Sequence, residues 1–252
     1  LFAVAKEEGL ECFSSPFDPT AVELLESLNV PAYKIASFEI TDIPLIELVA
    51  SKGKPIIIST GIAELEDIEL AIEACERMGN ENIAILKCTS SYPAPIEEAN
   101  MIMVKDFAER FNMIVGLSDH TIGSTVPVVA TCFGARIIEK HFILDRSIGG
   151  PDASFSMNEA EFTEMVKAVR EAEKAIGKVD YNLTDKQKKG KDFSRSLYIV
   201  ENIAEGEVLT EKNIRSIRPG FGLHPKFFKE VLGKKVKRNI EKGERLSLED
   251  LE

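Results

Sequence analysis

The chain has 252 residues, of which 44% are apolar and 29% are charged, and its formal net charge is −11. These values are typical of a globular protein with a large core, and the acidic balance argues against a protein that binds nucleic acid or an anionic membrane surface. No apolar run approaches the roughly 20 residues that a membrane-spanning helix needs.

The sequence predicts that strands and helices alternate over residues 1–177. The opening LFAVAKEEGL is typical of the end of an amphipathic helix. Six apolar or β-branched runs follow, each ending in small polar residues and each followed by a segment of helical period. The runs cover residues 11–17, 32–40, 55–60, 83–92, 113–120 and 135–142, and the helical segments cover residues 19–29, 43–53, 64–79, 104–112, 124–135 and 158–177.

This alternation predicts right-handed parallel βαβ units. The first unit contains no GxGxxG motif, which disfavours a dinucleotide-binding fold, and a (β/α)8 barrel is the better match. Six of the eight units of such a barrel are present, so we expect the chain to lack the first two. An open barrel has two unpaired sheet edges, and we therefore expect this chain on its own to be poorly soluble and inactive.

The last quarter of the chain has a different character. Residues 178–194 are polar, lysine-rich and without periodicity, which predicts a linker between a barrel domain at 1–177 and a small domain at 195–252. The excess of negative charge lies before residue 181. In the small domain, IAEGEVLTEKNI at 203–214 is echoed by IEKGERLSLEDL at 240–251, which indicates pseudo-two-fold symmetry. Thr210 and Ser247 are expected to be helix N-caps.

The four cysteines show no pattern that indicates chemistry. They are scattered, with no CxxC pair and no zinc-like spacing. We expect buried thiols of a cytoplasmic protein. The residues are Cys12, Cys75, Cys88 and Cys132.

Polar side chains stand where the predicted strands end, and the carboxyl ends of the strands carry the chemistry of a (β/α)8 barrel. A buried lysine there favours an anionic ligand, phosphate or carboxylate, although an ion pair with a nearby acid would also satisfy it. The strand ends hold Ser15, Lys34, Ser37, Glu39, Ser59, Thr60, Ser90, Tyr92, Ser118, His120 and His141.

His120 and His141 are two of only three histidines, and they end neighbouring predicted strands. Two neutral imidazoles could reach one divalent ion and leave positions open for water and substrate, a shell that suits Mn²⁺ or, less comfortably, Mg²⁺. The alternative is two core histidines bonded to backbone or to a neighbouring carboxylate, and spacing does not separate the two. The loop at 144–157 is a substrate clamp with Asp152 as a hydroxyl acceptor, or a plain surface excursion.

Taken together, the motifs resemble those of the sialic acid synthases. The matching segments are YKIASFE at 33–39, STG at 59–61, CTSSYP at 88–93, SDHT at 118–121, EKHFILDR at 139–146 and GPD at 150–152. The segment from Glu205 to Pro225 resembles their C-terminal antifreeze-like domain. Within the family, GGPDASFSM at 149–157 and RPGFGLHPK at 218–226 look most like the pseudaminic acid synthases.

The resemblance implies a TIM-type (β/α)8 barrel without its first two β/α units, followed by an antifreeze-like SAF domain of β-clip type. It implies an enzyme that condenses phosphoenolpyruvate with an amino-sugar aldehyde and water, using Mn²⁺ or Mg²⁺, and releases phosphate by C–O cleavage. The sugar would be 2,4-diacetamido-2,4,6-trideoxy-L-altropyranose, and the substrates of N-acetylneuraminate and legionaminate synthases are the alternatives. A 3-deoxy-heptulosonate-type enzyme is disfavoured by the appended domain, and a non-catalytic sugar-binding scaffold is disfavoured by the histidine pair.

The resemblance also implies roles for individual residues. His120 and His141 would hold the metal, and Glu39 would transfer protons. Arg218 would reach the sugar in the partner's barrel, which implies a domain-swapped homodimer. Phosphoenolpyruvate would bind to Ser15, Lys34, Ser37, Ser59, Ser90 and Ser118, and the sugar to Phe17, Tyr92 and Asp152, with Phe193 and Arg195 as further candidates.

Overall fold

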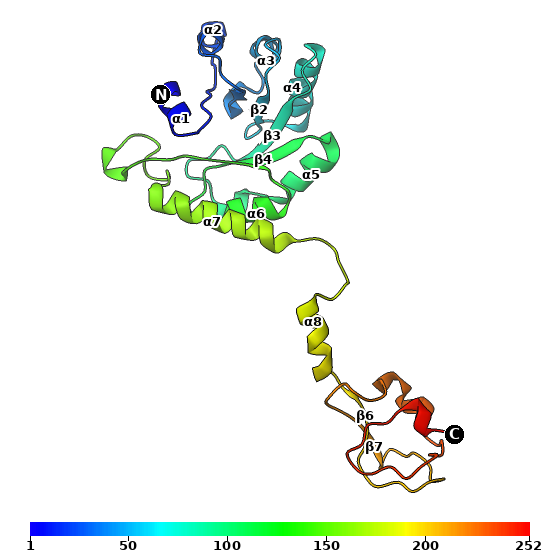
Figure 1. The fold of residues 1–252 in the computed structure, drawn as a ribbon. Coiled ribbons are helices and arrows are strands. Elements are labelled where there is room, and N and C mark those ends of the chain that lie inside the picture. Colours follow the sequence, from blue (N-terminus) through cyan, green and yellow to red (C-terminus); the bar gives the residue numbers. More distant parts are fainter. The chain divides into compact units, whose positions relative to one another are not determined.

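The computed structural model describes residues 1–252, which divide into two compact units, Leu1–Gly177 and Lys178–Glu252 (Figure 1). The first unit alternates strands with helices, and the second combines short β segments and turns with short helices. None of the helices is both long enough and apolar enough to cross a membrane.

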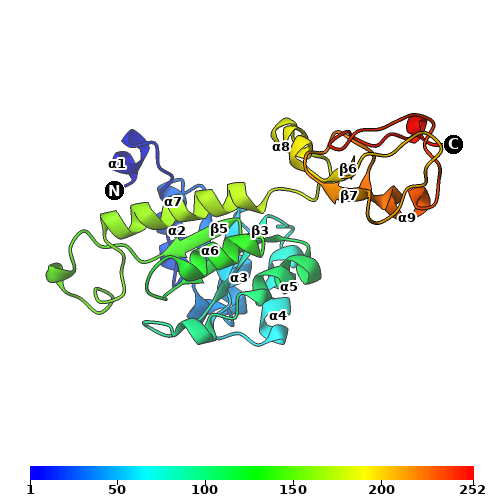
Figure 2. The same ribbon diagram turned by 90° about the horizontal axis from the view of Figure 1, so that it is seen from below.

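Five parallel strands form one sheet in the first unit, and their order in the sheet follows their order in the chain. This is the curled sheet of a (β/α)8-type fold, as predicted. Helices α6 and α7 pack side by side against it (Figure 2). The strands are β1 (Tyr33–Ile35), β2 (Ile56–Ser59), β3 (Ile83–Cys88), β4 (Ile114–Asp119) and β5 (Ile137–Lys140), and the helices are α1 (Phe2–Glu7), α2 (Pro19–Ser27), α3 (Ile43–Ala50), α4 (Leu65–Arg77), α5 (Ile102–Phe111), α6 (Thr125–Cys132) and α7 (Glu159–Ile176).

The first predicted strand, residues 11–17, is wrong. This segment forms only a single bridge from Ser14 to Tyr33. Its two aromatic residues, Phe13 and Phe17, are exposed, and Pro16 has no N–H group to donate to a strand ladder. The other five predicted strands are present, but each extends past the observed end into the turn that follows.

Polar caps set the starts of the helices between the strands. Asp18 accepts a hydrogen bond from the backbone of Ala21 at the start of α2, and Asp42 does the same for Leu45 at the start of α3. Helix α7 starts with a capping box, in which Asn158 and Glu161 each accept a hydrogen bond from the other's backbone N–H. These bonds satisfy N–H groups that have no partner within the helix.

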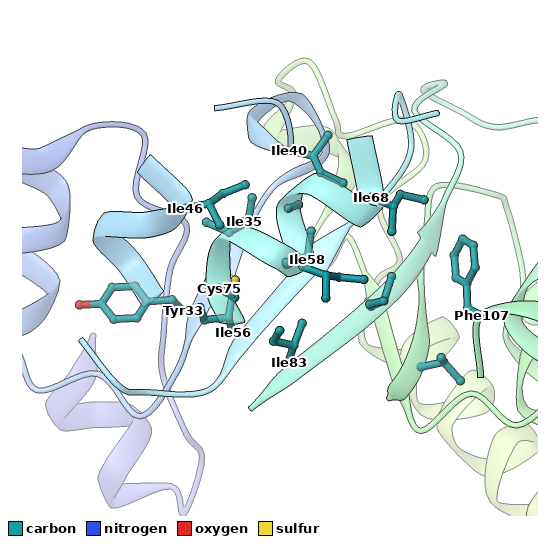
Figure 3. Close-up of a cluster of buried hydrophobic side chains, with 14 of the residues drawn as sticks. Tyr33, Ile35, Ile40, Ile46, Ile56, Ile58, Ile68, Cys75, Ile83 and Phe107 are labelled. Carbon is teal, nitrogen blue, oxygen red and sulfur yellow. The ribbon is translucent and has the colours of Figure 1, made fainter. Parts of the chain in front are cut away.

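Alternation along the strands sorts their side chains onto two faces. One face packs against the helices and forms the apolar core of the unit, to which Tyr33, Ile35, Ile56, Ile58 and Ile83 contribute (Figure 3). We call the opposite face the inner face. It carries Lys34 of β1, Ser59 of β2, Cys88 of β3, Ser118 of β4 and Glu139 of β5.

The predicted linker is not free of regular structure. Residues 178–194 include α8 (Asp185–Gly190) and the 3-10 helix η4 (Lys191–Phe193). Thr184 and Gln187 form a capping box at the start of α8. This helix could not be predicted from hydrophobic periodicity, because its six residues are stabilised by polar caps and it buries no apolar face.

The second unit has the pseudo-two-fold symmetry that the repeat predicts. Ile203 and Ile240, which occupy equivalent positions, exchange two backbone hydrogen bonds of 2.9 Å. The bonds around them occur in equivalent pairs, for example Gly206 N to Val236 O with Gly243 N to Ile199 O, and Leu209 N to Lys234 O with Leu246 N to Leu197 O. The elements are β6 (Ser196–Ile199), β7 (Ile214–Ile217), η5 (Pro225–Phe227), α9 (Phe228–Val231) and η6 (Leu248–Asp250).

The two predicted N-caps of this unit differ in outcome. Ser247 caps the 3-10 helix η6 through a capping box with Asp250, as predicted. Thr210 caps no helix, which corrects the prediction. The residue equivalent to Asp250 is Asn213, whose side chain accepts from Thr210 N and donates to Val208 O. Strand β7 begins at the next residue, so only a turn fits.

All four cysteines are free, but they are not all buried. Cys75 and Cys88 are buried, as expected. Cys132, the last residue of α6, is exposed, and Cys12 is partly exposed. The prediction of buried thiols is therefore wrong for these two.

Candidate active site

Lys34 lies on the inner face of β1 with 7% of its surface exposed. Its ammonium donates to Ser59 Oγ at 2.7 Å and to Ile35 O at 3.1 Å. The nearest carboxylate oxygen, Glu139 Oε2, is 3.8 Å away on a half-exposed side chain. Burial lowers the pKa of Lys34, and the charge of Glu139 acts in the opposite direction. An ammonium has three donors, so this lysine can give one more hydrogen bond to an anion.

Ser37 and Ser90 form a second group of donors close to Gly61. Ser37, in the 3-10 helix η1 (Ser37–Glu39), accepts from the backbone of Ile62 at 3.1 Å and from Ser90 Oγ at 2.8 Å. A Cβ on Gly61 would lie 2.1 Å from Ser90 Oγ and 2.8 Å from Ser37 Oγ. The glycine of the STG motif is therefore required by the close approach of its backbone to these two hydroxyls.

Glu139 joins Lys34 to Ser118 and was not among the predicted site residues. Ser118 Oγ donates to Glu139 Oε1 at 2.6 Å. The two residues are register partners in β4 and β5. Strand alternation places Glu139 on the same face as His141, and this signal in the EKHF segment could have identified it.

His120 and His141 lie together, with 5.2 Å between their ring centroids. Nδ1 of the buried His120 is 3.1 Å from Thr89 O, so a proton on Nδ1 is donated there and Nε2 keeps its lone pair. Nδ1 of His141 is 3.6 Å from Asp152 Oδ2. Burial lowers the pKa of His120, which favours the neutral imidazole that a metal ion requires.

These two imidazoles fit a divalent metal ion as protein donors. No group of three or more His, Cys, Asp and Glu side chains is arranged to hold a metal ion. Water or substrate oxygens would have to complete the coordination, as in a catalytic site with open positions. Mn²⁺ accepts such a mixed shell of nitrogen and oxygen donors.

Two aromatic rings enclose the histidine pair. The ring of Tyr92 is 4.3 Å from that of His120, and the ring of Phe155 is 5.0 Å from that of His141. Phe155 is 4% exposed and was not among the predicted site residues. The segment 144–157 brings it there, because Met157 N donates to His141 O at 2.9 Å and ties the end of the segment to the sheet.

Glu39 ends η1, and its Oε2 is a buried oxygen without a hydrogen-bond partner. Buried polar atoms normally have partners. This carboxylate oxygen is therefore free to accept a hydrogen bond from a ligand or a water molecule. No ion pair joins Lys34 to Glu39, and the acid near Lys34 is Glu139.

Several predicted residues make none of the contacts described above. Ser15 is partly exposed and takes no part in the hydrogen bonds of the site, and Phe17 is 65% exposed. Three others belong to the second unit. Phe193 and Arg218 are exposed there, and Arg195 donates to Ser216 O at 2.7 Å.

Comparison with known proteins identifies relatives over the whole chain. The NeuB family profile matches residues 1–181 and the SAF domain profile matches residues 194–252. The pseudaminic acid synthase of Helicobacter pylori is 48% identical over all of this chain and 74% of its own length, and that of Campylobacter jejuni strain 81-176 is 46% identical over 99% and 73%. The N,N'-diacetyllegionaminic acid synthase of Legionella pneumophila is 34% identical over 100% and 72%.

The folded chain is also similar to solved structures. The spore coat polysaccharide biosynthesis protein SpsE of Bacillus subtilis is 33% identical, with a TM-score of 0.67 over all of this chain and 76% of that one. The relatives from Helicobacter, Campylobacter and Legionella are named as synthases, and none of these matches supports the expectation that this chain is inactive. The chain belongs to the NeuB family, the sialic acid synthases, and carries a C-terminal SAF domain.

Proposed function

We propose that the chain is a pseudaminic acid synthase. It condenses phosphoenolpyruvate with 2,4-diacetamido-2,4,6-trideoxy-L-altropyranose and water to give pseudaminic acid and phosphate. The observation that carries this choice is the identity of 46–48% with pseudaminic acid synthases over essentially the whole chain, against 34% with a legionaminic acid synthase. The legionaminate and N-acetylmannosamine reactions remain the alternatives.

Phosphoenolpyruvate binds to the donors on and beside the inner face. The ammonium of Lys34 has one donor to spare, and the Ser37–Ser90 pair adds hydroxyl groups. Charge-assisted hydrogen bonds to phosphate and carboxylate oxygens are stronger than neutral ones. Ser59 and Ser118 hold Lys34 and Glu139 in place, and Ser15 remains a candidate at the edge.

His120 and His141 would hold a divalent metal ion, Mn²⁺ or Mg²⁺, beside this anion site. When bound, the metal makes a sugar carbonyl a better electrophile. The chain itself sets the position of this centre, because the Nδ1 contacts with Thr89 and Asp152 orient both imidazoles. Tyr92 and Phe155 limit the access of water to the pair.

The reaction joins C3 of phosphoenolpyruvate to the aldehyde carbon of the sugar. Water adds at C2, and phosphate leaves with cleavage of its C–O bond. Glu39 is the proton-transfer group, through the buried oxygen that has no partner in the structure. Fixing both substrates on one rim removes much of the entropic barrier to their encounter.

The subunit arrangement that we propose is a domain-swapped homodimer in the cytoplasm. Arg218, exposed in the second unit, would extend to the sugar in the partner's barrel, with Phe193 and Arg195 at the same rim. Equilibrium ultracentrifugation of the natural full-length protein tests this, and a monomer that keeps full activity would contradict it.

Phosphate release tests the proposed reaction. The natural full-length protein is incubated with phosphoenolpyruvate, Mn²⁺ and either the trideoxy-altrose sugar or N-acetylmannosamine. We expect release with the altrose sugar only and none after chelation. Release with N-acetylmannosamine instead would keep the chemistry and overturn the substrate assignment. Release with neither sugar would shift the proposal to the legionaminate precursor.

A further inference from the structure

A buried ion pair flanks the two histidines on the opposite face of the sheet. Asp119 precedes His120 at the end of β4, and Lys140 precedes His141 at the end of β5. Alternation turns both charged side chains away from the inner face. Lys140 Nζ is 2.6 Å from Asp119 Oδ2, and each side chain is only 1% exposed.

Both charges are fully hydrogen-bonded. Asp119 accepts from Thr121 N at 2.9 Å and from Thr121 Oγ1 at 3.1 Å in addition to Lys140. Lys140 uses its remaining donors on Thr121 O and on Gly123 O. The network thus ties the end of β4, the end of β5 and the turn after β4 into one unit.

Stability alone does not account for such a pair. Removing two charges from water costs several kcal/mol per ion, and well-packed apolar residues in their place are often as stable or more stable. What the pair supplies is a defined geometry. Asp119 and Lys140 are register partners, so any slip or splay between the ends of β4 and β5 would break the contact.

We propose that Asp119 and Lys140 are positioning residues for the histidine pair. Each is one residue away from a histidine, and their contact fixes the separation at which the two imidazoles face one ion. This inference rests on the proposed function, since it assumes that His120 and His141 hold the metal.

Mn²⁺ affinity of the natural full-length protein, measured by electron paramagnetic resonance of free Mn²⁺, tests the inference without reference to turnover. Because partners that orient metal ligands typically contribute roughly 10–100-fold to metal affinity, we expect Asp119→Asn and Lys140→Met each to weaken Mn²⁺ binding by that factor. Thr121→Val, which removes one hydrogen bond to Asp119, should weaken it by about threefold. This mild variant decides the question if the other two do not fold.

Lys54→Met is the matched control. The Lys54–Glu26 ion pair has an N–O distance of 2.7 Å and lies in the same unit, and its loss should change Mn²⁺ affinity by less than about twofold. If the variants at Asp119 and Lys140 melt at lower temperature but bind Mn²⁺ like the parent, the pair is purely structural and the inference fails. His120→Ala separates a failure of the positioning role from a failure of the proposed metal site. If it binds Mn²⁺ unchanged, the proposed metal site itself is wrong.

Discussion

Gly61 offers a sharp test of the phosphoenolpyruvate site. Its φ angle is not positive, so alanine is compatible with the backbone and only space opposes it. The new Cβ would stand 2.1 Å from Ser90 Oγ, whereas ordinary contact begins at 3.4 Å. Ser90 must therefore move by more than 1 Å, which breaks its 2.8 Å hydrogen bond to Ser37.

The expected cost has two parts. Overpacking of this kind lowers the free energy of unfolding by about 1–3 kcal/mol. Losing one hydrogen bond to a charged ligand costs about 1.5–3 kcal/mol, which corresponds to a rise of roughly 10–100-fold in the KM for phosphoenolpyruvate. Initial rates of phosphate release at varied phosphoenolpyruvate give KM, and thermal melting gives stability.

Gly190→Ala is the control for Gly61→Ala. Gly190 is the last residue of α8, and nothing lies within 4 Å of an added Cβ there. This variant should keep its KM and melt at the same temperature or slightly higher. A Gly61→Ala protein with parental KM and melting temperature would refute both the close approach and the role of the Ser37–Ser90 pair.

Four further results are expected. Burial lowers the pKa of Lys34, so its ammonium deprotonates at a lower pH than an exposed lysine does. KM for phosphoenolpyruvate should rise as the pH increases through that lowered pKa. In Lys34→Arg, which stays charged, this rise should vanish. Glu139→Gln removes the charge that raises the pKa of Lys34, so the rise in KM should begin at lower pH. If KM depends on pH as in the parent protein, Glu139 does not influence the ionisation of Lys34. Chelation should abolish phosphate release and added Mn²⁺ should restore it. Activity that persists after chelation would show that the reaction does not require the metal ion. Asn158→Ala should cost about 1 kcal/mol of stability, a melting shift of about 2–4 °C, with KM unchanged.

The fold could be predicted because strand and helix periods alternate cleanly over residues 19–177. The observed strands are shorter than predicted, since apolar and small residues continue past the last ladder hydrogen bond. The SSY segment after Cys88, for example, leaves the sheet and forms the turn that carries Ser90. Residues 11–17 look the same by composition, but their aromatic side chains face solvent, and burial is not visible in a local pattern.

Candidate site residues could be predicted where the residue type and its place at a strand end were enough to indicate chemistry. His120 and His141 stand out because the chain has only three histidines, and Lys34 stands out because a lysine within a buried strand needs an anionic partner. Alternation puts Glu139 on the same face as His141, but it does not show what Glu139 contacts, and no single residue type marks Phe155. The role of Glu139 depends on the register of β5 against β4, and that of Phe155 depends on a segment that folds back onto the sheet. Both are long-range relations.

The inner face changes character along the strands, and this explains why the chemistry is confined to one rim. In β3 the inner-face residues are Ala84 and Leu86 and then Cys88, and in β4 they are Gly116 and then Ser118, followed by His120. Apolar or small residues fill the lower layers, as in the packed interior of a barrel. In β3, β4 and β5 the polar groups stand at the last inner-face positions, Cys88, Ser118 and Glu139. The same strand ends carry the Asp119–Lys140 ion pair on the other face, so a buried ion pair backs the layer that we propose to bind the substrates.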